Sequence, residues 1–205
     1  MAPSALIDAT WQGKPRKLLV QANRNGFLYV LDRTNGKFLF GRAYTKDLTW
    51  AKGLTSDGRP ILIPGHEPTE QGTLSCPWLN GASNWYSTSY NPLTGLYYVQ
   101  TNDKCGIYTR TDMEYHEGRT HMGGSFSGDP ANPGQRILRA FDVHTGELVW
   151  QLPEIGDAAS WEECSAALVA WSFMDPMTRR SRPLTHEMES CFGGFKRMHP
   201  HMLPP

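Results

Sequence analysis

One ten-residue pattern occurs three times in the sequence, and this repeat constrains the fold more than any other feature. In each copy an apolar residue precedes Asp or Asn, a Gly follows four residues later, and an apolar or aromatic run comes next. Asx and Gly tolerate the positive φ angles of tight turns, and aromatic and β-branched flanks suit a half-buried strand. Each copy therefore predicts a β-hairpin: Leu31–Phe40 (LDRTNGKFLF), Tyr90–Val99 (YNPLTGLYYV) and Phe141–Trp150 (FDVHTGELVW).

Two further strands are predicted upstream of the first hairpin, at Lys17–Ala22 and Gly26–Val30, around a turn at 23–25. No amphipathic helix is predicted before residue 160. Repeated units of a few antiparallel strands are typical of propeller blades, so we expect an all-β chain with two to three blades. Gly53–Asn80 and Ile107–Arg136 are rich in Gly, Pro, Ser and Thr and are predicted to be long loops on the rim. Hairpins alone do not exclude an ordinary β-sandwich.

Composition excludes several classes of partner. Hydrophobic residues make up 39% of the 205, as in a globular domain, and 20 basic residues balance 20 acidic ones. Without a basic field we expect no nucleic-acid partner. No apolar run approaches the roughly 20 residues that cross a bilayer, so no membrane span is predicted. The N-terminus lacks the pattern of a signal peptide, so a chain expressed as given is expected to be cytoplasmic.

Four segments carry a resemblance to a known family: Gln21–Lys37, Cys76–Pro77 with Gly81–Trp85, Ser89–Pro92 and Leu138–Trp150. They resemble the quinoprotein (PQQ-dependent) methanol and alcohol dehydrogenases. The first combines a cofactor-facing turn with a blade hairpin, the second and third match the family in order and spacing, and the fourth matches the hairpin before the last cofactor-contacting turn. The resemblance extends from about Leu6 to Trp161.

The resemblance implies a fold and a reaction. It implies part of an eight-bladed β-propeller with pyrroloquinoline quinone (PQQ) near the axis. A calcium or lanthanide ion would act on the quinone as a Lewis acid while an aspartate takes the proton of the alcohol and hydride passes to the quinone. A small alcohol is the implied substrate, cytochrome c the implied electron acceptor, and the periplasm the implied location. The chain is thus interpreted as a fragment of a PQQ-dependent alcohol dehydrogenase.

The resemblance also assigns cofactor-binding residues. Arg24 matches the arginine or lysine that stabilises negative charge on the quinone oxygens, although a strand-end arginine is also commonly just solvated. Asn84 matches an asparagine that hydrogen-bonds the cofactor, with a plain turn residue as the alternative. Trp85 is either a wall of the site or a core side chain. Trp161 matches the tryptophan of the last turn, but Glu162–Glu163 replaces the glycines that follow it in the family.

No catalytic residue and no metal site is predicted in this chain, because the family places both in blades that precede the matched region. His116 and His121 are five residues apart in a Gly-rich loop, and the zinc-protease motif requires four. Cys76 and Cys105 match paired cysteines of methanol dehydrogenases, which implies a disulfide between them. No such partner is implied for Cys164 or Cys191.

Three functions remain open at this point. The chain is a partial dehydrogenase that is inactive alone, or a non-catalytic propeller scaffold that binds other proteins, or one of two pieces whose missing blades come from a neighbouring gene product. Retention of Arg24 and Asn84 in matching turns favours the first, since a scaffold has no need of them.

Residues 162–205 are predicted to be a frameshifted translation that is poorly ordered, so that the propeller portion is 1–161. This stretch holds five of the eight methionines and two of the 20 glycines, and it contains no Tyr, Ile, Asn or Gln. Reading the codons one base earlier from the end of the Trp161 codon permits a Gly-rich turn and then Asp-Ala-Arg-Asn-Gly-Lys, a fourth copy of the hairpin.

Overall fold

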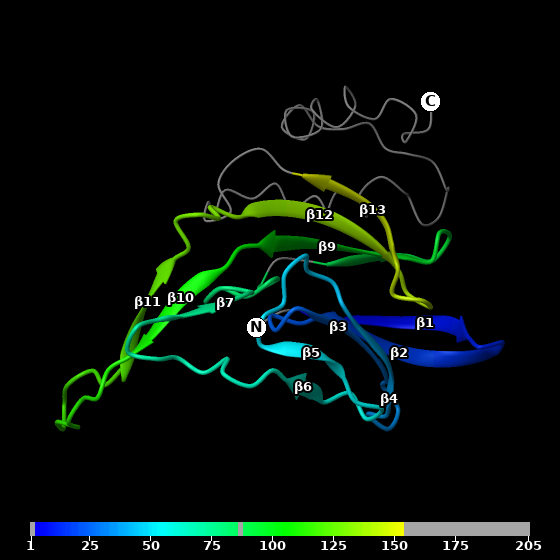
Figure 1. Cartoon of the computed structure of the whole chain (residues 1–205). Coiled ribbons are helices and arrows are strands. Elements are labelled where there is room, and N and C mark those ends of the chain that lie inside the picture. The colour runs from blue at the N-terminus through cyan, green and yellow to red at the C-terminus, as the bar shows by residue number, and fades with distance from the viewer. Residues whose placement is uncertain (1–2, 86–87, 154–205) are drawn as a thin grey trace.

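The computed structural model of the chain describes residues 3–85 and 88–153, and these residues form strands and no helix. Two four-stranded antiparallel sheets make up the body (Figure 1). In each the strands lie side by side in chain order, the arrangement of a propeller blade, although β10 and β11 are inserted between the second and third strands of the second sheet. The first blade has the order β1-β2-β3-β4: β1 (Ala5–Trp11), β2 (Lys14–Ala22), β3 (Phe27–Asp32) and β4 (Phe38–Ala43). The second has the order β8-β9-β12-β13: β8 (Ser89–Asn91), β9 (Leu96–Asp103), β12 (Gln135–Asp142) and β13 (Leu148–Pro153).

All three predicted hairpins form, and they share one hydrogen-bonding pattern. The glycines Gly36, Gly95 and Gly146 all have positive φ, from 66° to 73°. In each turn the Asx side chain accepts a hydrogen bond from the backbone N–H two residues on, and the Gly N–H donates to the Asx carbonyl. The copies are not equivalent, however. The first and third join the last two strands of a blade and the second joins the first two, so three hairpins make two blades.

The segments predicted to be long loops contain short strands. β5 (Ala51–Leu54) pairs with β6 (Pro60–Leu62), and β7 (Thr73–Ser75) pairs with β10 (Gly106–Arg110), which also pairs with β11 (Gly124–Gly128). The prediction of loops without regular structure was therefore too simple. Their backbone groups pair with partners distant in sequence, such as Leu74 with Ile107, which a local composition cannot indicate.

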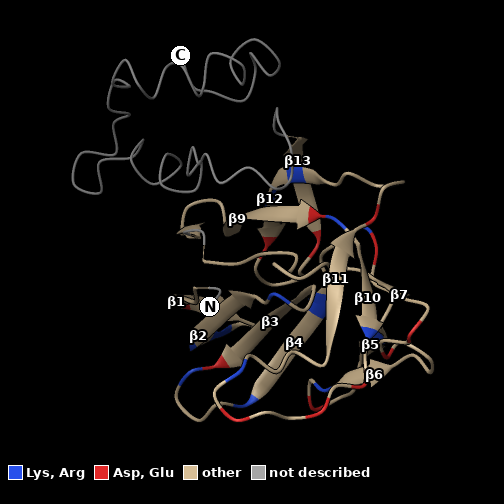
Figure 2. Ribbon diagram, turned by 90° about the vertical axis from the view of Figure 1, so that its left-hand side faces the viewer, with Lys and Arg blue, Asp and Glu red and all other residues tan. Residues whose placement is uncertain are grey.

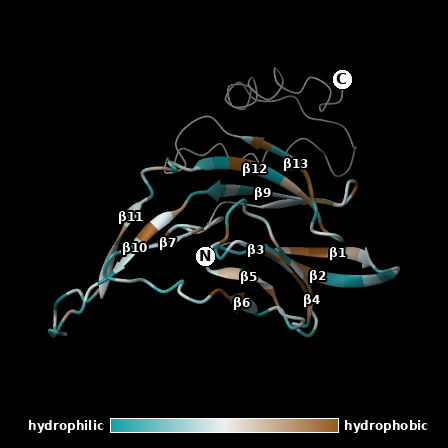
Figure 3. Cartoon of the chain, in the orientation of Figure 1, coloured by the Kyte–Doolittle hydropathy of each residue, from teal (hydrophilic) through white to brown (hydrophobic). Residues whose placement is uncertain are grey.

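The core lies between the two blades, which pack face to face. Alternate residues of β2 and β3 point from the first blade toward the second, and β9 and β12 contribute the facing side. Figure 3 shows a hydrophobic stretch in β12 and another in β1 of the first blade. The two sheets do not close into a ring within the described residues, so this is an incomplete β-propeller. The fully buried residues at the interface include Leu18, Val20, Leu28, Val30, Tyr97, Val99 and Val143.

Candidate functional site

The turn that carries Arg24 connects β2 to β3 and is closed by its own asparagines. Asn23 Oδ1 accepts a hydrogen bond from the N–H of Asn25 (3.1 Å), and Asn25 Oδ1 accepts one from the N–H of Phe27 (3.0 Å). Gly26 has φ +96°, and a Cβ there would lie 2.8 Å from Leu48 Cδ1. The Asn-x-Asn-Gly order thus specifies the turn locally.

Three donors from outside the turn hold it in place, one on each of its carbonyl oxygens at 23, 24 and 25. These donors come from two other segments, the connection between β4 and β5 and the 76–85 loop, so the turn is fixed by tertiary structure as well as by its own sequence. The hydrogen bonds are Tyr44 Oη to Asn23 O (2.7 Å), Ala82 N to Arg24 O (3.0 Å) and Trp50 Nε1 to Asn25 O (3.1 Å).

Gly81 lies against the backbone of Arg24. Its φ is +81°, and a Cβ built on it would come within 2.7 Å of Arg24 Cβ and 2.9 Å of Arg24 O. The N–H of Gly81 donates to Trp78 O (2.8 Å), and Ala82 O accepts from the N–H of Asn102 (2.7 Å). The loop 76–85 is therefore in direct contact with the Arg24 turn, and the fold brings together the two segments that the resemblance singled out.

The predicted site residues differ in their surroundings. The Arg24 side chain is exposed and donates from Nη2 to Leu79 O (2.6 Å), its one recorded side-chain hydrogen bond in the described residues. Asn84 is half-buried and donates from Nδ2 to Asn80 O (3.0 Å). Its Oδ1 takes no part in that hydrogen bond. Trp85 is 51% exposed, so it is not a core side chain. Trp161 lies outside the described residues.

Two aromatic residues that the sequence analysis did not single out, Trp78 and Tyr108, both lie against Gly106. Burial raises the pKa of the Tyr108 phenol, and the positive charge of Arg24 opposes that shift. Trp78 has a buried Nε1 without a hydrogen-bond partner in the described structure, and Lys104 Nζ lies 4.2 Å from the centre of its ring. No local sequence signal marks this arrangement.

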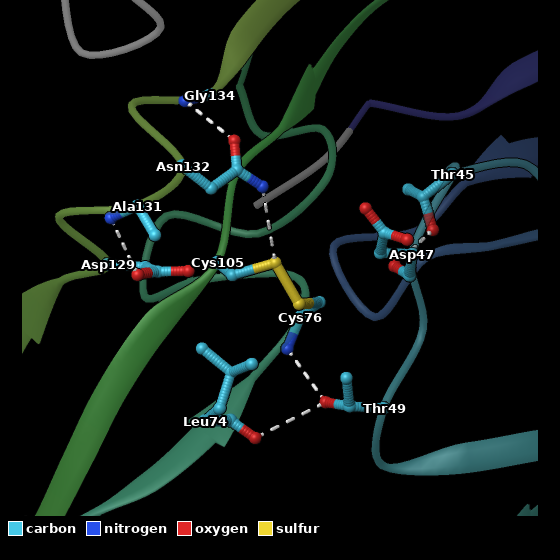
Figure 4. The surroundings of a disulfide bond; sticks show 10 residues. All are labelled: Thr45, Asp47, Thr49, Leu74, Cys76, Cys105, Asp129, Ala131, Asn132 and Gly134. Carbon is cyan, nitrogen blue, oxygen red and sulfur yellow. Dashed lines mark hydrogen bonds between the residues drawn. A yellow bond between two sulfur atoms is a disulfide. The ribbon is translucent and has the colours of Figure 1, made fainter.

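A disulfide between Cys76 and Cys105 anchors the start of the 76–85 loop, the pair that the resemblance implied (Figure 4). The two Cα atoms are 4.4 Å apart, within disulfide reach. The N–H of Cys76 donates to Thr49 Oγ1 (2.9 Å), and Asn132 Nδ2 contacts Cys105 Sγ at 3.9 Å. The loop that touches Arg24 is thus fixed to the strand system of β10. Cys164 and Cys191 lie outside the described residues.

A buried ion pair stabilises the second blade from within. Arg139 donates from Nη1 and Nη2 to the two carboxylate oxygens of Asp103, at 2.9 and 2.5 Å, and from Nη1 to Thr101 Oγ1 at 3.0 Å. Both side chains are at most 10% exposed. The pair borders an open cleft of about 940 Å³ between the blades, whose rim carries Arg42 and Glu147. With its charge neutralised, the pair is structural rather than reactive.

Neither a metal centre nor a spanning helix is present in the part of the chain that the structure describes. No three His, Cys, Asp or Glu side chains cluster there as metal ligands. No helix of sufficient length and apolar character to cross a membrane occurs among those residues.

No protein-family model matches the chain, but individual relatives do. The alcohol dehydrogenase PedH of Pseudomonas putida, a quinoprotein, is 40% identical over 147 residues, which are 68% of this chain and 25% of the relative. The quinohemoprotein alcohol dehydrogenase ADH IIB of Pseudomonas putida is 36% identical over 72% of this chain and 22% of its own length.

Two solved structures share the fold. The quinohemoprotein alcohol dehydrogenase of Comamonas testosteroni superposes with a TM-score of 0.68 at 28% identity, over 75% of this chain and 24% of that one. A europium-containing methanol dehydrogenase does so with a TM-score of 0.64 at 30% identity, over 74% of this chain and 27% of that one. The chain spans about a quarter of the length of the relatives it matches. By sequence and by fold, this chain belongs to the quinoprotein alcohol dehydrogenase family.

Proposed function

We propose that this chain supplies one arc of the cofactor site of a PQQ-dependent alcohol dehydrogenase, and that it is inactive alone. The observation that carries the proposal is the direct contact between the Arg24 turn and the Gly81–Ala82 backbone. This contact brings a guanidinium and the Asn84 loop to the same end of the blade pair.

The residues of this arc fit an anionic quinone cofactor. Arg24 offers a permanent positive charge and N–H groups beyond the one bonded to Leu79 O. Asn84 offers amide polarity, and Trp85 an exposed indole face. When bound, PQQ accepts the hydride that leaves the alcohol carbon. Arg24 would bind and orient the quinone through charge-assisted hydrogen bonds and stabilise negative charge that develops on its oxygens.

The remaining parts of the reaction are assigned to the rest of the enzyme. We propose that the ion, calcium or a lanthanide, and the general base lie in blades outside this chain, supplied by a longer parent or by a second polypeptide. A small alcohol as substrate, a cytochrome as electron acceptor and a periplasmic location complete the proposal. The Cys76–Cys105 disulfide supports the location, since such bonds persist in oxidising compartments.

A chimera tests the proposal. The quarter of the Comamonas testosteroni enzyme that this chain matches is replaced by residues 3–153, and PQQ binding and dye-linked alcohol oxidation are measured. We expect both to be retained, and Arg24→Ala to lower kcat/KM by about 100-fold, as for removal of one donor to developing charge.

The matched control is Arg33→Ala, which removes an arginine at the opposite end of β3 that pairs with Asp8 at 2.7 Å. This variant should retain the activity of the chimera. A folded chimera that fails to bind PQQ, or equal losses from both arginine variants, would favour the scaffold reading instead.

We also propose that residues 162–205 are a frameshifted translation. The test is the nucleotide sequence: the frame one base earlier after codon 161 must be open and encode a further blade hairpin. A stop codon in that frame would rule the proposal out.

A further inference from the structure

The sheet β11-β10-β7 projects from the blades, and β11 is its outer edge (Figure 1). Residues 125–128 of this strand are exposed, and Phe126 retains 46% of its accessible surface. Edge strands of soluble proteins are usually protected by Lys, Pro or a bulge. β11 (GSFSG) contains none of these, and Figure 2 shows it without a charged residue.

The register with β10 shows which backbone groups of β11 face outward. Thr111 N donates to Gly123 O (3.0 Å) and Asp129 N to Cys105 O (3.3 Å), so 111 with 123 and 105 with 129 are hydrogen-bonded pairs. Such pairs alternate along an antiparallel ladder, so the backbone N–H and C=O groups of Ser125 and Ser127 also point toward β10. Gly124, Phe126 and Gly128 therefore direct their N–H and C=O groups away from the sheet.

The sequence of β11 is a palindrome centred on Phe126. If a second copy pairs with it antiparallel about a two-fold axis, Phe126 lies opposite Phe126 and Gly124 opposite Gly128. The outward groups of these three residues then meet as hydrogen-bonded pairs in one consistent register. A shift by one residue would oppose outward groups to inward ones, and a shift by two would leave one outward residue of each β11 without a partner inside the strand. The centred register is therefore the one that pairs all three outward residues.

We propose that β11 is a self-association site through which two copies of this chain form an antiparallel, two-fold symmetric strand pair. This inference does not depend on the cofactor role of Arg24. It joins the two projecting sheets into one continuous sheet that crosses the dimer, a form of β-strand addition.

Side chains on β10 and next to β11 match the same symmetry. The ring of Phe126 lies 6.4 Å from that of its cross-strand neighbour Tyr108, so the two-fold axis produces a row of four aromatic rings. The charges at the two ends of β11 are also complementary between the two copies. Arg110 pairs with Gly124 at one end of the strand, and Asp129 follows Gly128 at the other, so each Arg110 comes to the same end as the partner's Asp129. No like charges face each other within the strand.

Disulfide cross-linking tests the register. In a background with Cys164→Ser and Cys191→Ser, the variant Phe126→Cys is oxidised mildly and the linked peptides are identified by mass spectrometry. Hydrogen-bonded antiparallel pairs have Cα atoms about 5.5 Å apart, within disulfide reach. We expect a covalent dimer linked through residue 126 of both copies.

The matched control is Ser125→Cys, whose opposite residue is Ser127. Two copies of residue 125 lie on a diagonal about 7–8 Å apart, beyond disulfide reach. This variant alone should not cross-link, whereas a mixture of Ser125→Cys and Ser127→Cys should give the mixed dimer. Equal cross-linking of all single variants would overturn the proposed register.

Sedimentation equilibrium of the full chain tests the association itself. A short strand pair buries less than a standard interface of about 1,600 Å², so the 23.0 kDa chain should approach twice its mass only as concentration rises. Phe126→Lys should abolish this increase, because like charges would face each other across the axis. Leu93→Lys, at a 61% exposed leucine in another hairpin, should leave it unchanged.

A chain that stays monomeric at every concentration, with no cross-link at residue 126, would overturn the proposal. So would an association that Phe126→Lys and Leu93→Lys weaken equally. Near-ultraviolet circular dichroism confirms that each variant is folded.

Discussion

Single residues outside the Arg24 turn determine its geometry. Tyr44, Trp50 and Ala82 each donate a hydrogen bond to one of its carbonyl oxygens, and Gly81 permits the close approach of the 76–85 loop. A site organised in this way is sensitive to changes in residues that support it from behind, since pre-organisation of a donor depends on its supports.

Gly81→Ala is predicted to destabilise the chain by about 1–3 kcal/mol beyond the ordinary strain of placing alanine at positive φ. The new Cβ would overlap the backbone of Arg24, which cannot move away as a flexible side chain would. The control is Gly95→Ala, which has a similar φ (+72°) and nothing within 4 Å of the added Cβ. Urea unfolding of both variants gives the difference, and equal losses would contradict the prediction.

Stability is predicted to fall in alkali because of Tyr97. Burial raises the pKa of this phenol from its ordinary value of 10.0 to about 12. Since the folded state disfavours the phenolate, the stabilisation is complete below pH 10 and is lost as the pH rises from 10 through about 12. The shift corresponds to about 3 kcal/mol at most. Tyr97→Phe should flatten the unfolding free energy over this range, and an unchanged slope would contradict the assignment.

At the scale of secondary-structure elements, the second blade depends on the ion pair that links β9 to β12. Arg139 and Asp103 form a two-point contact in a buried position, so their charges are stabilised only while both are present. A buried pair of this kind is costly to break and much less costly to replace as a whole.

Arg139→Met is predicted to destabilise the chain by about 3–5 kcal/mol, because it leaves the Asp103 carboxylate buried without its cation. The double variant Arg139→Met/Asp103→Leu should recover most of that loss. Thermal unfolding of the two variants and of Asp103→Leu completes a double-mutant cycle. If the double variant is less stable than both single ones, the pair contributes more than mutual neutralisation.

At the scale of the whole molecule, the two blades provide one side of a propeller and one arc of contacts to its axis. The isolated chain is predicted neither to bind PQQ tightly nor to oxidise alcohols in the presence of calcium, because a cofactor bound by one arc loses most of its contacts. Calorimetric titration and dye reduction check this. Micromolar binding of PQQ, or dye reduction driven by any alcohol, would contradict the prediction, because the chain would then bind or use the cofactor without the other blades.

The sequence alone determined the three hairpins, because each depends on an Asx and a Gly four residues apart that form their own hydrogen bonds. The family and the Arg24 and Asn84 segments were also evident from consecutive residues. Only the tertiary structure decided that three hairpins make two blades, that β7 pairs with β10, and that Tyr44, Trp50 and Ala82 hold the Arg24 turn. The three hydrogen bonds to the Arg24 turn join residues 21 to 58 positions apart, from Tyr44–Asn23 to Ala82–Arg24, so they form only when distant segments of the chain meet. The conformation of a turn is specified by neighbouring residues, whereas the hydrogen-bond partner of a buried polar group depends on which surfaces meet in the folded chain.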